Sequence, residues 1–413
     1  MNPPPSAGNP GRSRHPALRG WLAACALLAL MQIGCVPHRV YNPEPEDYLR
    51  NYPAAGEADA RFDLAVIEFD DYGGLWNRDQ LDGTIDLIQQ RNAEAERGVL
   101  VSVFIHGWTH DADPHRPGGD LSGFRENLAW VAQRIEHGDG LPPDRVVGVY
   151  IGWRGATTRF PVAKQLTFYD RRWAAERMVS HDMRETLVRI AAATKSRPGS
   201  KCLQTGHSMG GLILGQAMSH TLATLLLVGD DDGEPAEIDL VLLANPARDA
   251  LAAKQLVDFL KRTNTRTELR TPEGKVLPDR GPLIVSITSE ADDATGLVYP
   301  LGRGLSTLGG AFRGDHAEGE PSQRHLVTHT EGHVPFLISH TARLDDDGRV
   351  VLEEAPGRYN DTPFWIVRVT KDICADHGDL DNPNFGRLVR QIIELNQLYD
   401  ADVRKWIVSD TWK

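Results

Sequence analysis

One serine in this sequence stands in a glycine-rich turn of the kind that presents a nucleophilic hydroxyl. Ser208 lies in the run Gly206-His207-Ser208-Met209-Gly210-Gly211, directly after a short apolar run and directly before a long helical segment. A sharp strand-to-helix turn brings the flanking backbone close together, so residues without a side chain are needed on both sides of the serine. The spacing therefore predicts a nucleophile elbow with Ser208 at its apex.

A serine hydroxyl becomes an effective nucleophile when an imidazole takes its proton and a carboxylate orients that imidazole. After such an elbow the acid and then the base are expected further along the chain, each at the end of a strand. Three carboxylates follow the expected strand Leu283–Thr288, and we choose Asp292 first, Asp293 second and Glu290 third. We select His377 as the base because it lies just beyond an expected strand and before the last long helix. The other histidines after Asp292 are His316, His325, His329, His333 and His340.

The negative oxygen that forms during attack on an acyl carbon needs backbone N–H donors. The helix start after Ser208 supplies one, the amide of Met209, at the positive end of the helix. An earlier expected strand ends in His106-Gly107-Trp108. With these motifs the chain resembles the α/β-hydrolase superfamily of serine esterases and lipases. The resemblance implies that the amide of Trp108 is the second donor and that His106 is structural.

The resemblance covers about residues 98–398 and implies hydrolysis of an ester or related acyl bond through an acyl-enzyme. The implied substrate is a small-molecule or lipid acyl compound, and the chemistry requires no cofactor. Two alternatives stay open: an acyltransferase that uses the same three residues, and a noncatalytic binding protein of the cell envelope on the same scaffold. The sequence distinguishes neither the acyl substrate nor the oligomeric state.

The order of apolar runs predicts one α/β domain over residues 61–413. Short apolar runs alternate with amphipathic segments, which is typical of a doubly wound, mostly parallel sheet covered by helices on both faces. The resemblance implies that this sheet is of the α/β-hydrolase type. A Gly-rich stretch at 296–362 interrupts the alternation before the last strand, and we interpret it as an insertion or lid with a hairpin turning at Asp347-Gly348. The expected strands are Phe62–Phe69, Val99–Ile105, Arg145–Ile151, Lys201–Thr205, Ile238–Leu243, Leu283–Thr288 and Phe364–Val369. The expected helices include Leu121–Glu136, Arg171–Ala193, Leu212–Leu227, Asp249–Arg262 and Phe385–Leu398.

Residues 1–35 have the layout of a secretory leader. A basic, Pro-rich beginning runs into the uncharged stretch Trp21–Gly34, which is short for a helix that spans a bilayer. Cys35 ends this stretch in a context that resembles a bacterial lipoprotein processing site, and we predict that it is lipidated. Cys25 fits the local pattern better but stands too early in the apolar run, and plain cleavage of a signal peptide or a retained membrane helix stay open.

The segment that follows the leader, residues 36–60, is rich in Pro, Glu, Asp and Ala and has no apolar period. This composition predicts a flexible tether between the leader and the folded body. The expected location is therefore the cell envelope, as a lipid-anchored protein that faces the periplasm or lies on the outer membrane, or otherwise a secreted protein. The leader or its lipid would supply the contact with the membrane.

Charge and cysteine content argue against several other classes of protein. The chain has 45 Lys+Arg against 57 Asp+Glu, a formal charge of −12, and no long basic run, so nucleic acid is not an expected partner. Four cysteines are too few for a disulfide scaffold and match no zinc pattern. No dinucleotide-binding glycine motif is present. His325, His329 and His333 are spaced by four, but Gly332 disfavours a helix there, and we predict no metal site.

Overall fold

A single twisted sheet forms the centre of the structure. The computed structural model describes residues 36–52, 61–116, 118–137, 144–158, 160, 167–228, 239–264, 282–314, 319–356 and 362–395. The sheet has 10 strands in the order β1-β2-β4-β3-β5-β6-β7-β10-β8-β9. Neighbouring strands are parallel except at the two edges, where β1 pairs with β2 and β8 with β9 in antiparallel register. The expectation of an α/β protein with a mostly parallel sheet is confirmed.

The strands expected from the apolar runs are all present, each within about two residues of its predicted bounds. Every residue of β2, β6 and β7 is buried, as expected for strands that are covered on both faces. These strands are β2 (Phe62–Glu68), β3 (Val99–Ile105), β4 (Arg145–Gly152), β5 (Lys201–His207), β6 (Leu240–Ala244), β7 (Ile284–Ser289) and β10 (Phe364–Val369).

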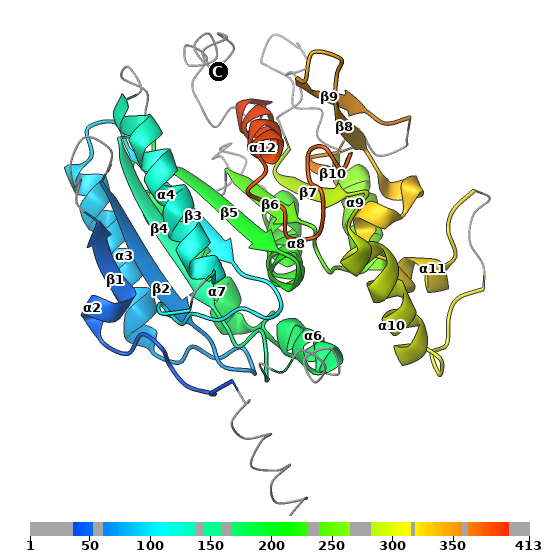
Figure 1. Ribbon diagram of the computed structural model, residues 1–413, viewed down its shortest axis with the longest axis horizontal. Helices are drawn as coiled ribbons and strands as arrows, with labels where there is room; N and C mark the ends of the chain where they lie inside the picture. The colour runs from blue at the N-terminus through cyan, green and yellow to red at the C-terminus, as the bar shows by residue number, and fades with distance from the viewer. Residues whose placement is uncertain are drawn as a thin grey trace, which may run out of the picture.

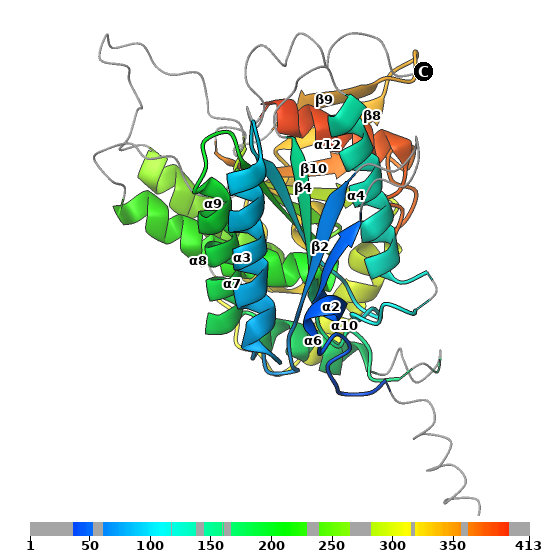
Figure 2. The same cartoon turned by 90° about the vertical axis from the view of Figure 1, so that its left-hand side faces the viewer.

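Helices cover both faces of the sheet, which Figure 2 shows nearly edge-on. One face carries the helices that pack over the largest apolar cluster: α3 (Arg78–Glu94), α7 (His181–Lys195), α8 (Met209–Val228) and α9 (Ala250–Asn264). The other face carries α4 (Asp120–His137) and α12 (Pro383–Leu395), each over a smaller cluster of its own. The helix α6 (Phe168–Arg177) lies at the lower end of the molecule in Figure 1.

The helix expected over Arg171–Ala193 is in fact two helices, α6 and α7, and that prediction is wrong about the residues between them. Ser180 has an extended backbone, and its hydroxyl accepts the Met183 N–H at 3.1 Å, which begins a new helix. The same hydroxyl donates to the Gly73 carbonyl oxygen at 2.6 Å, a contact with a remote loop. The pattern of apolar residues carries no sign of that contact, so it predicted one continuous helix.

The tether predicted for residues 36–60 is wrong for residues 36–52, which belong to the folded body. The strand β1 (Leu49–Tyr52) follows the short helix α2 (Pro45–Tyr48) and extends the sheet beside β2. Asn42 is fully buried, and its backbone N–H donates to the Glu68 carboxylate at 2.8 Å. The Asn42 side-chain amide also donates to this carboxylate, at 3.2 Å. Polar contacts and backbone strand pairing thus hold the segment, and neither requires an apolar period in the sequence. Residues 53–60 lie outside the described residues.

The stretch interpreted as an insertion or lid, 296–362, adds strands to the sheet as well as helices beside it. The predicted hairpin is present as β8 (His340–Leu344) and β9 (Val350–Glu354), and β8 pairs in parallel with β10. Gly348 in the turn has φ of 74°, a conformation that glycine adopts at no steric cost. The helical elements of this region are the π-helical turn η1 (Ala294–Val298), α10 (Tyr299–Ser306), α11 (Gln323–Thr328), η2 (Glu331–His333) and η3 (Pro335–Leu337).

The leader and its predicted lipidation site, Cys35, lie outside the described residues. Within the residues that the structure does describe, no helix combines the length and apolar character that crossing a membrane requires.

A buried ion pair attaches this insertion to the sheet and gives a testable stability prediction. The Arg248 guanidinium donates to the Glu331 carboxylate at 3.0 Å, and the two side chains are 1% and 0% exposed. We expect Glu331→Gln to lower the free energy of unfolding by about 3–5 kcal/mol, because it leaves a buried cation without its partner. Glu353→Gln is the matched control, since its pair with Arg343 is 51% exposed on both sides and should be worth less than about 1 kcal/mol. Urea denaturation of both variants measures this, and equal small losses would contradict it.

Candidate active site

Ser208 occupies a strained apex between β5 and α8. Its φ of 55° lies in the left-handed region, which a residue with a side chain rarely adopts. A Cβ atom on Gly206 would lie 2.5 Å from the Gly210 carbonyl oxygen, and one on Gly210 would lie 2.0 Å from the Ile105 carbonyl oxygen. Neither position can hold a side chain without moving the backbone. The glycines therefore permit the turn, as the sequence pattern predicts for an elbow.

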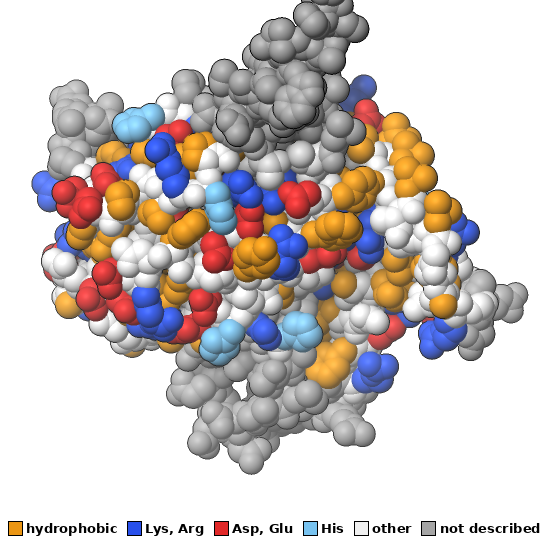
Figure 3. All heavy atoms as spheres, turned by 90° about the horizontal axis from the view of Figure 1, so that it is seen from below, with side chains coloured by type: hydrophobic (Ala, Val, Ile, Leu, Met, Phe, Trp, Pro, Cys, Tyr) orange, Lys and Arg blue, Asp and Glu red, His pale blue; other side chains and the backbone are white. Residues whose placement is uncertain are grey.

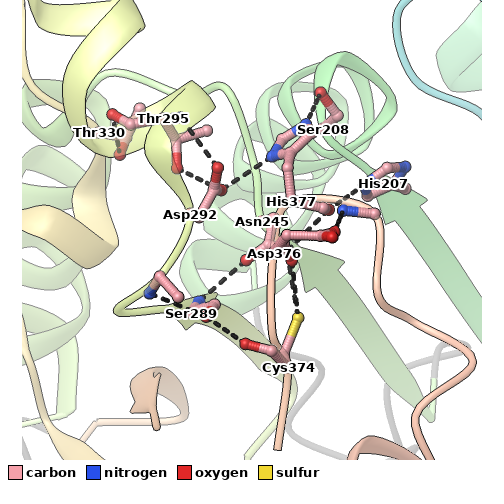
Figure 4. A network of polar contacts seen from close by, with 12 residues as sticks. His207, Ser208, Asn245, Ser289, Asp292, Thr295, Thr330, Cys374, Asp376 and His377 are labelled. Atoms are coloured by element: carbon pink, nitrogen blue, oxygen red, sulfur yellow. Dashed lines mark hydrogen bonds and ion pairs between the residues drawn. The ribbon is translucent and has the colours of Figure 1, made fainter. Parts of the chain in front are cut away.

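The three residues selected from the sequence lie in one chain of hydrogen bonds, shown in Figure 4. The His377 Nε2 atom is 2.8 Å from the Ser208 Oγ atom. The His377 Nδ1 atom is 2.8 Å from the Asp292 Oδ2 atom. Asp292 follows β7 and His377 follows β10, and these two strands are parallel neighbours. Their carboxyl ends therefore lie side by side, and residues 85 positions apart in the sequence meet there.

Of the three candidate carboxylates, Asp292 is the one that contacts His377. Asp292 is 1% exposed and lies on the inner side of its loop. Asp293 and Glu290 are both exposed, and Glu290 accepts the Lys371 backbone N–H instead. The first choice made from the sequence is therefore the residue that this geometry favours.

The environment of Asp292 keeps its carboxyl group ionised. Burial alone would raise the pKa, but hydrogen bonds from His377 and from Thr295 outweigh burial and hold the pKa of Asp292 below its ordinary value of 3.8. The Thr295 N–H donates at 3.1 Å and the Thr295 hydroxyl also donates to the carboxylate. An ionised acid accepts the His377 Nδ1–H, which leaves the Nε2 lone pair free to accept the Ser208 proton.

The segments that carry the two candidate oxyanion donors both lie next to Ser208. Met209 is the first residue of α8, where N–H groups have no partner within the helix. The loop that carries Trp108 approaches from β3: a Cβ atom on Gly107 would lie 2.8 Å from the Ser208 Cβ atom. The absence of a side chain at position 107 thus allows this loop to lie directly against the nucleophile.

His106 holds the peptide that carries the Trp108 N–H. Burial lowers the pKa of His106 to about 4, although hydrogen bonds with Gly107 and Trp153 oppose this, so the ring is neutral near pH 7. The ring accepts the Trp153 N–H at Nε2, at 3.0 Å, and therefore donates from Nδ1 to the Gly107 carbonyl oxygen, at 2.8 Å. In a trans peptide the N–H points opposite to the carbonyl, so fixing the carbonyl also fixes the Trp108 N–H. His106 has no contact with Ser208 among these bonds, which suits the structural role implied for it.

Two residues that the sequence reasoning missed hold the base in place, and both are visible in Figure 4. The backbone carbonyl oxygen of His377 accepts one hydrogen bond from His207 Nε2 and another from Asn245 Nδ2, both at 2.9 Å. Asn245 follows β6 with φ of 44°, and its Oδ1 atom accepts the Ser289 N–H at 2.9 Å. A polar residue directly after a buried strand was the available signal for Asn245, and membership of the elbow was the signal for His207.

Asn245→Ala should impair the placement of His377 and also removes the acceptor of the Ser289 N–H. We expect kcat to fall about tenfold to a hundredfold with a smaller change in KM, because a displaced base slows proton transfer more than it weakens binding. Asn92→Ala is the matched control, because Asn92 is also a buried asparagine and its side chain donates to the Ala193 carbonyl oxygen at 2.8 Å rather than to His377. Both variants should lose stability, so steady-state kinetics that show the same kcat for both would refute the positioning role.

The described residues contain no group of three or more His, Cys, Asp or Glu side chains that could hold a metal ion. The histidines spaced by four do not share one helix, because α11 ends at Thr328. His325 and His329 stack with ring centroids 3.9 Å apart. His333 lies elsewhere, with its Nε2 atom 3.1 Å from the Thr295 hydroxyl.

Comparison with known proteins adds little to this site. No model of a protein family matches the sequence, and neither does any curated protein. One solved structure, of an uncharacterized protein from Pseudomonas aeruginosa, is similar over 72% of this chain and 45% of that one, with 12% identity and a TM-score of 0.23. This chain therefore spans less than half the length of that protein. The similarity is too low to carry an argument about function, which must come from the residues themselves.

Proposed function

We propose that this chain is a serine hydrolase of the α/β-hydrolase type that cleaves an ester or related acyl bond. One observation carries the proposal: His377 links Ser208 to Asp292 by two hydrogen bonds. The bond from Ser208 Oγ to His377 Nε2 and the bond from His377 Nδ1 to Asp292 Oδ2 are each 2.8 Å long. Their order in the chain and their positions after β5, β7 and β10 support the assignment to this superfamily.

In the proposed mechanism His377 Nε2 takes the proton of Ser208 as its Oγ atom bonds to the acyl carbon. The carbonyl electron pair moves onto oxygen, where the amides of Met209 and Trp108 stabilise the negative charge by about 3 kcal/mol per donor. The intermediate collapses, and the leaving group departs with the proton from His377. Water then repeats these steps on the acyl-enzyme and releases the acid.

The nature of the acceptor separates a hydrolase from a transferase. An alcohol or amine in place of water would make the same residues an acyltransferase, and a scaffold without turnover would be a binding protein. The strained serine with an ordered base supports catalysis, because a surface used for binding has no need of a left-handed backbone at position 208.

A fluorophosphonate probe tests the proposal directly. We expect the folded protein to be labelled once per chain, at Ser208, and Ser208→Ala to abolish the labelling. No labelling of the folded protein would favour the noncatalytic alternative. Product analysis with an added alcohol would then separate hydrolysis from transfer.

We also propose that the protein is located in the cell envelope. The leader at 1–35 and the candidate lipidation site Cys35 favour the cell envelope. Mass spectrometry of the mature N-terminus tests this, since a diacylglyceryl group on Cys35 would support an anchor and an unmodified terminus would support a secreted protein.

A further inference from the structure

One face of the helical segment η1–α10 exposes a stripe of leucines to solvent. Leu297, Leu301, Leu305 and Leu308 are 58%, 66%, 70% and 72% exposed. Leu297 lies in η1, Leu301 and Leu305 lie in α10, and Leu308 lies in the turn that follows α10. The spacing of four residues places Leu301 and Leu305 on the same side of α10. Val298, which is 52% exposed, lies beside them. A continuous exposed apolar stripe of this kind marks a contact with something absent from the isolated chain.

The opposite side of the same segment is firmly packed, so the stripe is held in a defined orientation. Tyr299 is buried, and its hydroxyl accepts a hydrogen bond from Arg172 of α6 at 2.8 Å. A Cβ atom on Gly302 would lie 1.4 Å from the Tyr169 hydroxyl oxygen, so α10 lies directly against α6. Trp173 on α6 is 56% exposed and adds a further large apolar side chain to this end of the molecule.

The stripe lies close to the candidate catalytic residues along the chain. Asp292 precedes η1 by two residues, and Thr295 within η1 donates to the Asp292 carboxylate. Figures 1 and 2 place α6 and α10 at the same lower end of the molecule. Figure 3, which views that end directly, shows hydrophobic side chains gathered toward the right, on the side of α10.

The described chain also begins at this end. In both Figures 1 and 2 the dark blue start of the chain lies at the bottom, near α6. Val36 is its first residue, and the Val36 N–H donates to the Thr157 carbonyl oxygen at 2.9 Å. The residue before it is Cys35, and the uncharged stretch Trp21–Gly34 comes before that. The chain segment that follows this uncharged stretch therefore begins at the same end of the molecule as α10.

We propose that the leucine stripe of η1–α10 contacts a lipid bilayer and that the nearby active site takes an acyl lipid from it. The described chain begins at this end, and the apolar stretch Trp21–Gly34 precedes it in the sequence, which favours lipid over a second copy of the chain. The chain has a net charge of −12, so anionic lipids would repel it rather than attract it. The proposed contact is therefore hydrophobic. The choice of a lipid substrate rests on the proposed hydrolase function, whereas the membrane contact does not.

A fluorophore placed on the stripe reports directly whether the stripe itself contacts the membrane. The full chain carries Cys25→Ser and Cys35→Ser, with Leu305→Cys labelled by an environment-sensitive dye. The two remaining cysteines are buried, and burial raises the pKa of Cys202 to about 12, so they react slowly at neutral pH. Leu395→Cys on α12 is the matched control, because Leu395 is 49% exposed and α12 lies at the upper end of Figure 1.

With zwitterionic phosphatidylcholine vesicles we expect the dye at 305 to shift to the blue and to be quenched by doxyl-labelled lipid, and the dye at 395 to remain unchanged. A dye at 305 that stays in water, whether or not the chain sediments with the vesicles, would overturn the proposal. Burial of the dye without vesicles would also overturn it: dependence on protein concentration would indicate a second copy, and independence would indicate the chain's own leader.

A separate experiment tests the part of the proposal that names a lipid as the substrate. Leu301→Glu combined with Leu305→Glu should slow hydrolysis of a vesicle-borne lipid ester at least tenfold and change hydrolysis of a short soluble ester less than twofold. Leu395→Glu should change neither rate. Equal losses on both substrates would overturn the lipid assignment. Absence of fluorophosphonate labelling in every variant would refute the hydrolase function instead, while the dye would still report on membrane contact.

Discussion

Ser208→Ala is expected to lower kcat for ester hydrolysis by about ten-thousandfold to a millionfold, the largest effect of any single change in this chain. The hydroxyl lost is the one that bonds to the acyl carbon, and it lies 2.8 Å from the His377 Nε2 atom. His377→Ala should cost a similar factor, because the serine and the imidazole act together. The double variant should be no slower than either single variant, since removing one already disables the other. Release of p-nitrophenol from an activated ester measures all three.

The control for these variants is His220→Ala, because His220 is an exposed histidine on α8 outside the hydrogen-bond chain. It should retain activity within about twofold, as expected for a surface substitution. Additive losses in the double variant, or near-normal activity of His377→Ala, would show that the two residues do not work as one unit. A different base would then have to be sought for Ser208.

Asp292→Asn is expected to lower kcat by about ten-thousandfold with little change in the fold. The amide is nearly the same size as the carboxylate but can donate a hydrogen bond to His377 Nδ1. The ring would then carry its proton on Nε2, where it cannot accept the Ser208 proton. Stopped assays with excess enzyme can detect the residual rate, and the near-UV circular dichroism spectrum should match that of the unmodified chain.

Asp293→Asn and Glu290→Gln are the matched controls for this prediction. Both neighbours are exposed carboxylates of the same loop, and Glu290 contacts Lys371 rather than His377. Each variant should keep activity within about threefold, as other surface changes do. A larger loss in either of them than in Asp292→Asn would move the acid to that residue.

The region 296–362 contacts elements that hold the candidate catalytic residues. Its hairpin extends the sheet beside β10, the strand that leads to His377, and its buried Glu331 pairs with Arg248 after β6. The turn η1 overlaps its start and holds Asp292 through Thr295, and η1 and α10 carry most of the exposed leucine stripe. A change in this region can therefore affect the acid, the base and the proposed membrane contact together.

The sequence alone determined the buried strands of the sheet and the elbow, because both depend on local patterns. Runs rich in Val, Ile and Leu are buried wherever the strands lie in the sheet, so their predicted bounds differ from the observed ones by about two residues at most. Gly206 and Gly210 marked the turn because contacts at Cβ distance exclude any larger residue. The order of strand ends after Ser208 was enough to choose Asp292 and His377 as candidates.

Tertiary structure alone decided the features that depend on remote partners. Residues 36–52 have no apolar period and are held by remote contacts: β1 pairs with β2, and Asn42 donates to the buried carboxylate of Glu68. The break before α7 depends on the contact of Ser180 with Gly73, and the anchoring of His377 depends on Asn245. Each of these is a hydrogen bond between residues far apart in the chain, so its partner leaves no mark on the neighbouring sequence. Local periodicity predicts what is buried, whereas the pairing of polar groups follows only from the folded arrangement.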